Sequence, residues 1–542
     1  MWFKRKKFLP TVSFEEIFLD AQNLGEFEQE RMEGRMESPL PAFIFFLAAA
    51  AAMGVGILFF GRGVFLMMFE GEKWRARAEE NHFESIALRP ARGIFFDRFA
   101  IPLFDEERTL FDPKAFSHVI GFVGKDEAKG KAGLEEMFDG MIRGSDGERS
   151  LEVDAQGRVV SEGTIRNPIA GLPITTTLDA ELQRKVFSVL EEMRATREFK
   201  GGAAVLFDVK NGEIFALISA PGYDANALSR GGPSETIEAM RADSDLPFFN
   251  RAIAGAYHPG SIIKPIVAAA ALEENIIGAE DRIVSEGALR VSDPYRPGEE
   301  SVFLDWKAHG SVDMRRALAV SSNVYFYVVG GGFKHIGGLG IHRLAEWFTR
   351  FGLGSKTHIP LVGEHAGLVP DPDQKSRYHP ENPIWRLGDT YHASIGQGDF
   401  LVTPLQIARM LAMIANNGTA PAFRFVVSQN ARADNTVFSL ALEEETFRVV
   451  KEGMRRAVTE GTATALAHAA VPFAGKTGTA EFGDKQRVHS WFMGFAPYEK
   501  PRLGIVVLLE SGPRQNLVGA PYAASQIVDW IIAHRDYLKT VE

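Results

Sequence analysis

The sequence predicts an α/β or α+β domain, an antiparallel sheet flanked by helices, behind one membrane-spanning helix. Residues 41–60 are apolar and uncharged, which is typical of a membrane span. Two pairs of apolar runs predict adjacent strands: 203–209 and 213–220 around Asn211-Gly212, and 491–496 and 503–509 around a proline-flanked turn. Asn-Gly between apolar runs is a strong hairpin signal. Apolar helical stretches at 404–414 and 524–533 can cover the sheet.

The N-terminal apolar segment predicts a transmembrane helix at residues 41–61. About 20 helical residues measure about 30 Å, which matches a bilayer core. A cleaved signal peptide has a shorter apolar region of roughly 7–15 residues, so we expect the anchor to be retained. A buried helix of a soluble protein is the alternative. Residues 1–40 form a polar tail with a basic cluster at 4–7. A solvated N-terminus with some affinity for anionic lipid explains this cluster better than a specific docking role.

Composition excludes several classes of function. The 542 residues are enough for more than one domain, and the net charge of −10 gives no reason to expect a nucleic acid partner. The chain has no cysteine, so it forms neither a disulfide nor a thiolate metal site, which suits a protein outside the cytoplasm. Its glycine-rich run at 330–338 lacks the surroundings of a phosphate-binding loop. We expect no cofactor and no metal.

The segment 257–265 is the strongest candidate for chemistry. Pro265 is tolerated only in the first turn of a helix, which places Ser261 at a helix N-terminus. Lys264 lies three residues on and projects from the same face. A serine needs a neighbouring base to become a nucleophile, and a lysine serves only when burial and nearby positive charge lower its pKa. Alone, S-x-x-K arises about once by chance in such a chain.

Two further motifs follow in order. Ser321-Ser322-Asn323 comes after a helical stretch at 313–320, and Lys476-Thr477-Gly478-Thr479 lies on a strand that precedes the second hairpin. The order S-x-x-K, S-x-N and K-T-G is found in penicillin-binding proteins and class A β-lactamases. Together the three motifs predict acyl transfer through a serine.

The chain resembles the class B penicillin-binding proteins, and among them the elongation-type penicillin-binding protein 2. The resemblance runs from about residue 88 to 530 and includes these motifs: Arg92-Gly93-Ile94 with Asp97-Arg98, Gly133-Leu134-Glu135, Asn250-Arg251-Ala252, Pro259-Gly260-Ser261, Gly388-Asp389-Thr390, Ser394-Ile395-Gly396-Gln397-Gly398 and His489-Ser490-Trp491-Phe492. Residues 385–403 and the stretch Asp305-Trp306 to His309-Gly310 favour the elongation type over the division type.

The resemblance implies a penicilloyl-serine transferase (β-lactamase/transpeptidase-like) fold for residues 199–542. It implies a β-rich, non-catalytic pedestal for residues 62–198. Relatives carry a long insertion, the head subdomain, between the Arg92 motif and the segment 111–124, and here that interval is short. We therefore expect a shortened pedestal in which the head is missing or minimal.

The resemblance also implies a role for each motif residue. Ser261 attacks the carbonyl between the terminal D-alanines of a peptidoglycan stem peptide, and Lys264 is the base. Ser321 relays a proton to the leaving amine, and Asn323 holds Lys264 and the substrate amide. Lys476 supplies positive field, Thr477, Gly478 and Thr479 bind substrate, and the amides of Ser261 and Thr479 form the oxyanion hole. An amine of a second stem peptide then forms the cross-link.

Further expectations concern surroundings and partners. The resemblance implies covalent binding of β-lactam antibiotics and a RodA-type (SEDS-family) glycan polymerase with other elongation-complex proteins as partners. We expect a single-pass protein of the bacterial inner membrane, with a cytoplasmic N-terminus and a periplasmic catalytic domain. The arginines and lysines at 62–77 oppose this orientation by a simple positive-inside count. The cluster at 4–7 and the resemblance favour it.

Several alternatives stay open. The same motifs serve a division-type transpeptidase, a D,D-carboxypeptidase or a β-lactamase-like hydrolase, although no deacylating glutamate is recognisable. A scaffold that no longer turns over is another alternative. Asp305 and His309 have spacing that suits metal ligands, and some relatives hold zinc near this region. Without cysteine a complete ligand set is not evident, so a hydrogen-bonded pair at the rim of the site is favoured.

Overall fold

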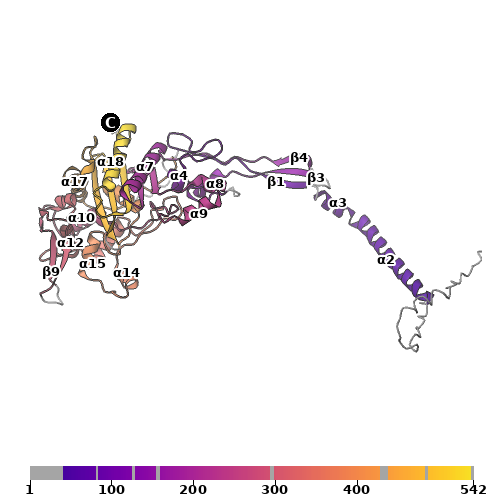
Figure 1. The fold of residues 1–542 in the computed structure, drawn as a ribbon, viewed down its shortest axis with the longest axis horizontal. Helices are drawn as coiled ribbons and strands as arrows, with labels where there is room; N and C mark the ends of the chain where they lie inside the picture. Colours follow the sequence, from indigo (N-terminus) through magenta and orange to yellow (C-terminus); the bar gives the residue numbers. More distant parts are fainter. Residues whose placement is uncertain are drawn as a thin grey trace, which may run out of the picture. The chain divides into compact units, whose positions relative to one another are not determined.

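A computed structural model describes residues 41–80, 83–124, 129–153, 159–292, 298–427, 438–482 and 486–538 (Figure 1). The predicted tail, residues 1–40, lies outside the described residues. The chain divides into two compact units, Met1–Ser85 with Ser150–Gly163, and Ile86–Arg149 with Thr164–Glu542. Each unit is described by itself.

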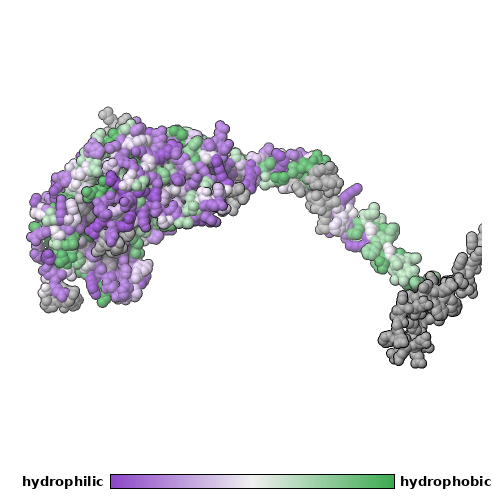
Figure 2. Space-filling view, in the orientation of Figure 1, coloured by the Kyte–Doolittle hydropathy of each residue, from purple (hydrophilic) through white to green (hydrophobic). Residues whose placement is uncertain are grey.

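The first unit contains the predicted apolar helix. Helix α2, Ala42–Phe69, is long and apolar enough to cross a membrane, and none of its residues is buried. Its surface is mainly green in Figure 2, the colour of hydrophobic residues. The helix continues past the predicted end at residue 61 because Arg62 favours helix and the residues after it are again apolar. Helix α3, Gly71–Glu80, follows, and strands β1, Phe83–Leu88, β3, Gly147–Val153, and β4, Val159–Arg166, form a three-stranded sheet.

The second unit is built on one five-stranded antiparallel sheet. Its strand order is β14-β15-β16-β6-β7, with bounds Ala474–Phe482, Arg487–Ala496, Leu503–Pro513, Gly201–Asp208 and Ile214–Ala220. The strand pair β6 and β7 and the strand pair β15 and β16 are the two predicted hairpins, which confirms both. Gly212 has φ +74° in the first turn, a conformation that glycine adopts without strain.

Helices bury both faces of this sheet. Helices α7, Ala180–Arg197, and α18, Ala520–His534, pack on one face of the sheet (Figure 1). They share a core there with alternate residues of β6 such as Ala204 and Leu206. Helices α10, Lys264–Glu273, α12, Asn323–Gly331, and α16, Pro404–Ala415, share the second core with Val205 and Phe207. The predicted fold class, an antiparallel sheet flanked by helices, is confirmed.

The second unit contains further helices and short strands besides these. The side of α10 carries α11 (Met314–Val320), α13 (Gly340–Arg350), α14 (Pro372–Tyr378), α15 (Leu387–Ser394), α17 (Glu444–Glu460) and the short strands β8 (Ile283–Ser285), β9 (Ala288–Ser292), β10 (Glu300–Leu304), β11 (Gly310–Val312), β12 (Thr419–Ala420) and β13 (Phe438–Ser439). The 3₁₀ turn η2 (Thr464–Leu466) packs against α18. The segment before β6 contains both short helices and short strands: β2 (Phe95–Phe96), α4 (Pro113–Ile120), α5 (Gly133–Met137), α6 (Asp139–Ile142) and β5 (Ile174–Thr175). Two further helices, α8 (Ala225–Arg230) and α9 (Ser234–Ala242), follow β7.

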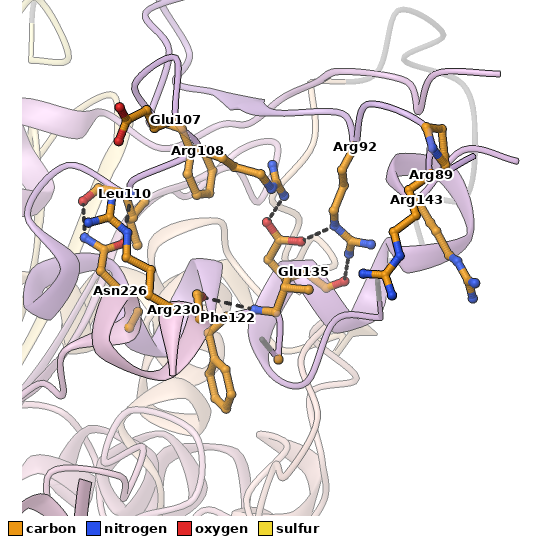
Figure 3. A pocket seen from close by; sticks show the side chains of 17 residues that line it. Arg89, Arg92, Glu107, Arg108, Leu110, Phe122, Glu135, Arg143, Asn226 and Arg230 are labelled. Atoms are coloured by element: carbon orange, nitrogen blue, oxygen red, sulfur yellow. Dashed lines mark hydrogen bonds and ion pairs between the residues drawn. The ribbon is translucent and has the colours of Figure 1, made fainter. Parts of the chain in front are cut away.

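A buried carboxylate ties the loops of this segment together beside a cavity of about 280 Å³ (Figure 3). Glu135 is 1% exposed and accepts hydrogen bonds from Arg92 Nε, at 2.8 Å, and from Arg108. Arg92 also contacts Asp139 at 2.6 Å, and Arg108 Nη1 donates to Gly93 O at 3.0 Å. The arginines satisfy both oxygens of Glu135, so we assign the cluster a structural role.

Glu135→Ala is expected to lower the stability of the full chain by about 3 kcal/mol, because removing one partner of a buried ion pair leaves the other unpaired. The loss stays at the low end of the usual range since Arg92 keeps Asp139. Thermal unfolding in detergent measures this as a drop of several degrees. Asp146→Ala is the matched control, because its ion pair with Arg143 is 3.7 Å long and exposed. Equal melting temperatures for the two variants would contradict the structural role.

Candidate active site

Ser261 lies in a short 3₁₀ turn, η1, Gly260–Ile263, directly before α10. The α-helix itself begins at Lys264, three residues later than the serine, and Pro265 occupies its first turn as predicted. The missing N–H of proline costs nothing there because first-turn donors have no intrahelical partner. The N–H of Ser261 belongs to the first turn of η1, where donors likewise have no partner within the helix.

The turn is held tightly between two other segments. The Gly260 N–H donates to Gly396 O at 2.9 Å. On the other side, η1 packs against β14 so closely that a Cβ on Gly478 would lie 2.9 Å from Pro259 O. Any side chain at position 478 would therefore displace the serine turn. Close approach of the η1 segment is thus sufficient to explain the glycine of the third motif.

Lys264 is fully buried and points to the second motif. Its Nζ donates to Ser321 O at 2.8 Å and to Asn323 Oδ1 at 2.7 Å, and it lies 3.4 Å from Ser321 Oγ. Among the described residues the Ser261 hydroxyl makes no hydrogen bond. A direct contact between the Lys264 amine and the Ser261 hydroxyl therefore stays a prediction.

Lys476 approaches the same serine from β14. It is fully buried, and its Nζ donates to Ser321 Oγ at 2.8 Å and to Thr477 O at 3.0 Å. Ser321 follows α11 with φ +58°, the left-handed region that non-glycine residues rarely adopt. Such strain is concentrated at functional sites. The Ser321 hydroxyl thus lies between the amino groups of two lysines.

Burial sets the electrostatics of the two lysines. Loss of solvent lowers the pKa of Lys264 to about 7, while the negative charge of Asp305 opposes that effect. Burial and the positive charge of Lys264 hold the pKa of Lys476 well below its ordinary value. A lysine with a pKa near neutrality can accept a proton at physiological pH, which an exposed lysine cannot.

Asp305 and His309 do not form the expected hydrogen-bonded pair. His309 Nε2 lies 3.6 Å from Asp305 Oδ1, which is an ion-pair distance, and that buried nitrogen has no hydrogen-bond partner within the described chain. The Asp305 oxygens are occupied by other donors, including the hydroxyls of Ser285 and Ser322. In the part of the chain that the structure describes, no group of three or more potential metal ligands occurs.

The remaining residues of the third motif lie on the strand at the end of the sheet order. Thr479 is exposed and Thr477 is partly buried, so both are accessible from one side of β14. The Thr477 hydroxyl hydrogen-bonds to that of Thr462 at 2.6 Å, a partner that no sequence motif indicated. The substrate-binding roles predicted for Thr477, Gly478 and Thr479 stay predictions.

The structure therefore brings Lys264, Ser321, Asn323 and Lys476 into one hydrogen-bonded cluster, with Ser261 one turn before Lys264. The arrangement combines a serine, a lysine with a pKa of about 7, a second hydroxyl between the amino groups of two lysines, and the end strand of a sheet. It suits acyl transfer through a serine. Sequence reasoning did not predict the contacts of Asp305. It also did not predict that the Leu304 carbonyl accepts a hydrogen bond from Asn323 Nδ2 at 3.3 Å. The sequence pairs Asp305 with His309 but gives no sign of these contacts, and Leu304 belongs to no motif.

Comparisons with known families give a consistent result. Residues 202–529 match the model of the penicillin binding protein transpeptidase domain, and residues 103–176 match that of the penicillin-binding protein dimerisation domain. The chain is 31% identical over 463 residues to the peptidoglycan D,D-transpeptidase MrdA of Acinetobacter baumannii, covering 78% of this chain and 65% of that protein. It is 30% identical over 464 residues to MrdA of Escherichia coli K12, covering 77% and 70%.

Solved structures agree with these matches. Pseudomonas aeruginosa PBP2 in complex with WCK 5153 superposes with a TM-score of 0.69 at 28% identity, covering 84% of this chain and 99% of that one. A chain from a peptidoglycan synthase complex, studied for the coordination of polymerization and crosslinking, has a TM-score of 0.69 at 26% identity and covers 92% and 99%. The similarity extends over both the segment before β6 and the domain that follows.

Proposed function

The chain belongs to the class B penicillin-binding proteins, in the MrdA (PBP2) group of peptidoglycan D,D-transpeptidases, and from this premise we propose that it cross-links peptidoglycan stem peptides through an acyl-enzyme on Ser261 during cell-wall elongation. The chain spans 65% of the Acinetobacter relative and 70% of the Escherichia coli relative, so activity and substrate are inferred for this chain. The observation that carries the proposal is the single cluster formed by Lys264, Ser321, Asn323 and Lys476.

In the acylation step, Ser261 Oγ forms a bond to the carbonyl carbon between the two terminal D-alanines. Lys264 takes the serine proton, because burial lowers its pKa to about 7 and so leaves a large fraction of the amine neutral at that pH. Ser321, hydrogen-bonded to Lys476 and near Lys264, passes a proton to the leaving amine. The C–N bond breaks, D-alanine leaves, and the stem peptide remains as an ester on Ser261.

The transition state carries negative charge on the carbonyl oxygen. The N–H groups of Ser261 and Thr479 are proposed to bind it, and one such donor is typically worth about 3–4 kcal/mol. The position of β14 at the end of the sheet allows the stem peptide to add as a further strand. Thr477 and Thr479 then lie where their hydroxyls can bind the terminal carboxylate. An amine of a second stem peptide attacks the ester and completes the cross-link.

Acylation is expected to slow as the pH falls below about 7. Lys264 acts as a base only when neutral, and its pKa of about 7 means that acid protonates it in this range. The acylation rate constant with a penicillin, measured between pH 5.5 and 9, should rise with pH and level off above the pKa. A rate that does not change across this range would exclude Lys264 as the titrating base.

The partner proposal concerns a RodA-type glycan polymerase, since no glycosyltransferase motif is recognisable in this sequence. The similarity to a chain of a peptidoglycan synthase complex supports it. We further propose that α2 spans the inner membrane with residues 1–40 in the cytoplasm and the transpeptidase domain, from about residue 199, in the periplasm. The pedestal of residues 62–198 is proposed to be shortened. Protease protection of oriented vesicles tests the orientation.

Labelling of membrane fractions with a fluorescent penicillin tests the function. Stable, stoichiometric label supports a transpeptidase, and rapid loss of label supports the hydrolase alternatives. A folded protein without label would be a scaffold. Depletion of the protein followed by cell imaging separates the two transpeptidase roles, because rounding indicates elongation and filamentation indicates division.

A further inference from the structure

We propose that Asp305 is a positioning residue for the reaction: its carboxylate holds the Ser321-Ser322-Asn323 segment so that the Asn323 amide oxygen faces Lys264. The proposal rests on the proposed function, in which Lys264 is the base. Asp305 contacts neither Ser261 nor the reacting atoms. It acts through the second motif, although it lies 16 residues before that motif in the sequence and outside it.

The carboxylate of Asp305 is the centre of five hydrogen bonds. Oδ2 accepts from the hydroxyls of Ser322, at 2.8 Å, and Ser285, at 2.9 Å, and from the Val324 N–H at 3.1 Å. Oδ1 accepts from the N–H groups of Asn323 and Trp306, each at 2.9 Å. Asp305 is 8% exposed. Three of the five donors belong to the first turn of α12 or its N-cap, where an anion is favoured by unpaired N–H groups and by the helix dipole.

These contacts determine the orientation of Asn323. Its N–H is held by Asp305, its Nδ2 donates to Leu304 O at 3.3 Å, and its Oδ1 accepts from Lys264 Nζ at 2.7 Å. Leu304 and Asp305 are adjacent, so one short segment at the end of β10 holds both the backbone and the amide nitrogen of Asn323. The only side-chain atom of Asn323 left to face Lys264 is the amide oxygen. A flipped amide would bring its NH₂ group against the lysine.

The charge of Asp305 has a second effect, on the titration of Lys264. The charged or titratable groups that act on Lys264 or respond to it are Asp305, Lys476 from β14 and His309, which precedes β11. Asp305 is the anion among them, and it raises the pKa of Lys264 against the effect of burial. A residue that only supported the fold through neutral contacts would leave the pKa of Lys264 unchanged.

The test compares acylation by a fluorescent penicillin in full-length wild type and Asp305→Asn, in detergent, as a function of pH. We expect the variant to acylate about 10- to 100-fold more slowly, the loss typical when an outer partner of a functional group is removed. We also expect the acid limb of its pH profile to move to lower pH, because removing the anion lowers the pKa of Lys264. An unchanged rate and an unchanged acid limb would overturn the proposal.

Ser285→Ala is the matched control. It removes one hydrogen bond from the same Asp305 oxygen but leaves the second motif untouched, so it should acylate within about twofold of wild type. Equal defects in the two variants would show that Asp305 only supports the β8 segment. If Asp305→Asn does not fold by circular dichroism, Asp305→Glu replaces it. Glutamate keeps the negative charge, but its side chain is one methylene longer. We therefore expect slower acylation with the acid limb of the pH profile at its wild-type position, and a wild-type rate would overturn the proposal. Failure of the wild type itself to label would instead contradict the proposed function.

Discussion

Replacing Ser261 with alanine is expected to remove all covalent labelling by penicillin. The acyl-enzyme is an ester of the serine Oγ, and no other hydroxyl in the cluster is expected to substitute, because the Ser321 hydroxyl already accepts from Lys476 at 2.8 Å and from Lys264 at 3.4 Å. Alanine fits the η1 turn without a steric conflict, so the fold should survive. Gel fluorescence of membranes that contain equal amounts of each protein measures the effect. Label should fall to background.

The matched control is Ser188→Ala. Ser188 lies on α7, on the opposite face of the sheet, and its hydroxyl donates a hydrogen bond to Lys185 O of the same helix. This variant should label like wild type. Label that persists in Ser261→Ala would move the nucleophile to another residue and with it the proposed mechanism.

Replacing Lys264 with methionine is expected to slow acylation by about 10²- to 10⁴-fold, the usual contribution of a general base. Methionine has a similar length and suits a buried site. Lys264→Arg separates proton transfer from charge, because arginine stays protonated and cannot act as a base. Both variants should therefore be slow. Stopped-flow or time-resolved gel labelling with a penicillin gives the rate constants.

Lys356→Met controls for the loss of a lysine, since Lys356 is exposed and remote from the motifs in sequence. If Lys264→Arg acylates nearly as fast as wild type, the lysine supplies charge rather than proton acceptance. The expected dependence on pH below 7 would then also be absent. The two measurements thus test the same assignment by independent means.

Local sequence signals predicted much of the fold. Asn211-Gly212 between apolar runs placed β6 and β7 to within about two residues, since turn chemistry and side-chain alternation act over short distances. Pro265 located the start of α10 in the same way. The end of α2 at Phe69 was missed because a single charge, Arg62, does not end a helix.

The site was predicted in its members but not in its contacts. The three motifs named Lys264, Ser321, Asn323 and Lys476, which form the hydrogen-bonded cluster. Spacing along the chain could not show that Asp305 would accept a hydrogen bond from Asn323 and make none with His309. Likewise, the left-handed conformation of Ser321 follows from the way α11 ends against α12, and serine gives no sign of it. Contacts between distant segments depend on packing, which a single sequence does not record.

Because successive side chains of a strand point to opposite sides, β14 has one register that directs Lys476 to Ser321. Lys476 pairs with Met493 and Gly478 with Trp491. A shift by one residue would turn Thr477 toward Ser321 and carry Lys476 to the side of β14 on which Thr479 is exposed. Loss of a single residue before Lys476 in β14 would therefore separate the lysine from Ser321 even where the strand still paired. The spacing of the third motif is protected by the packing of the strand as well as by the chemistry it serves.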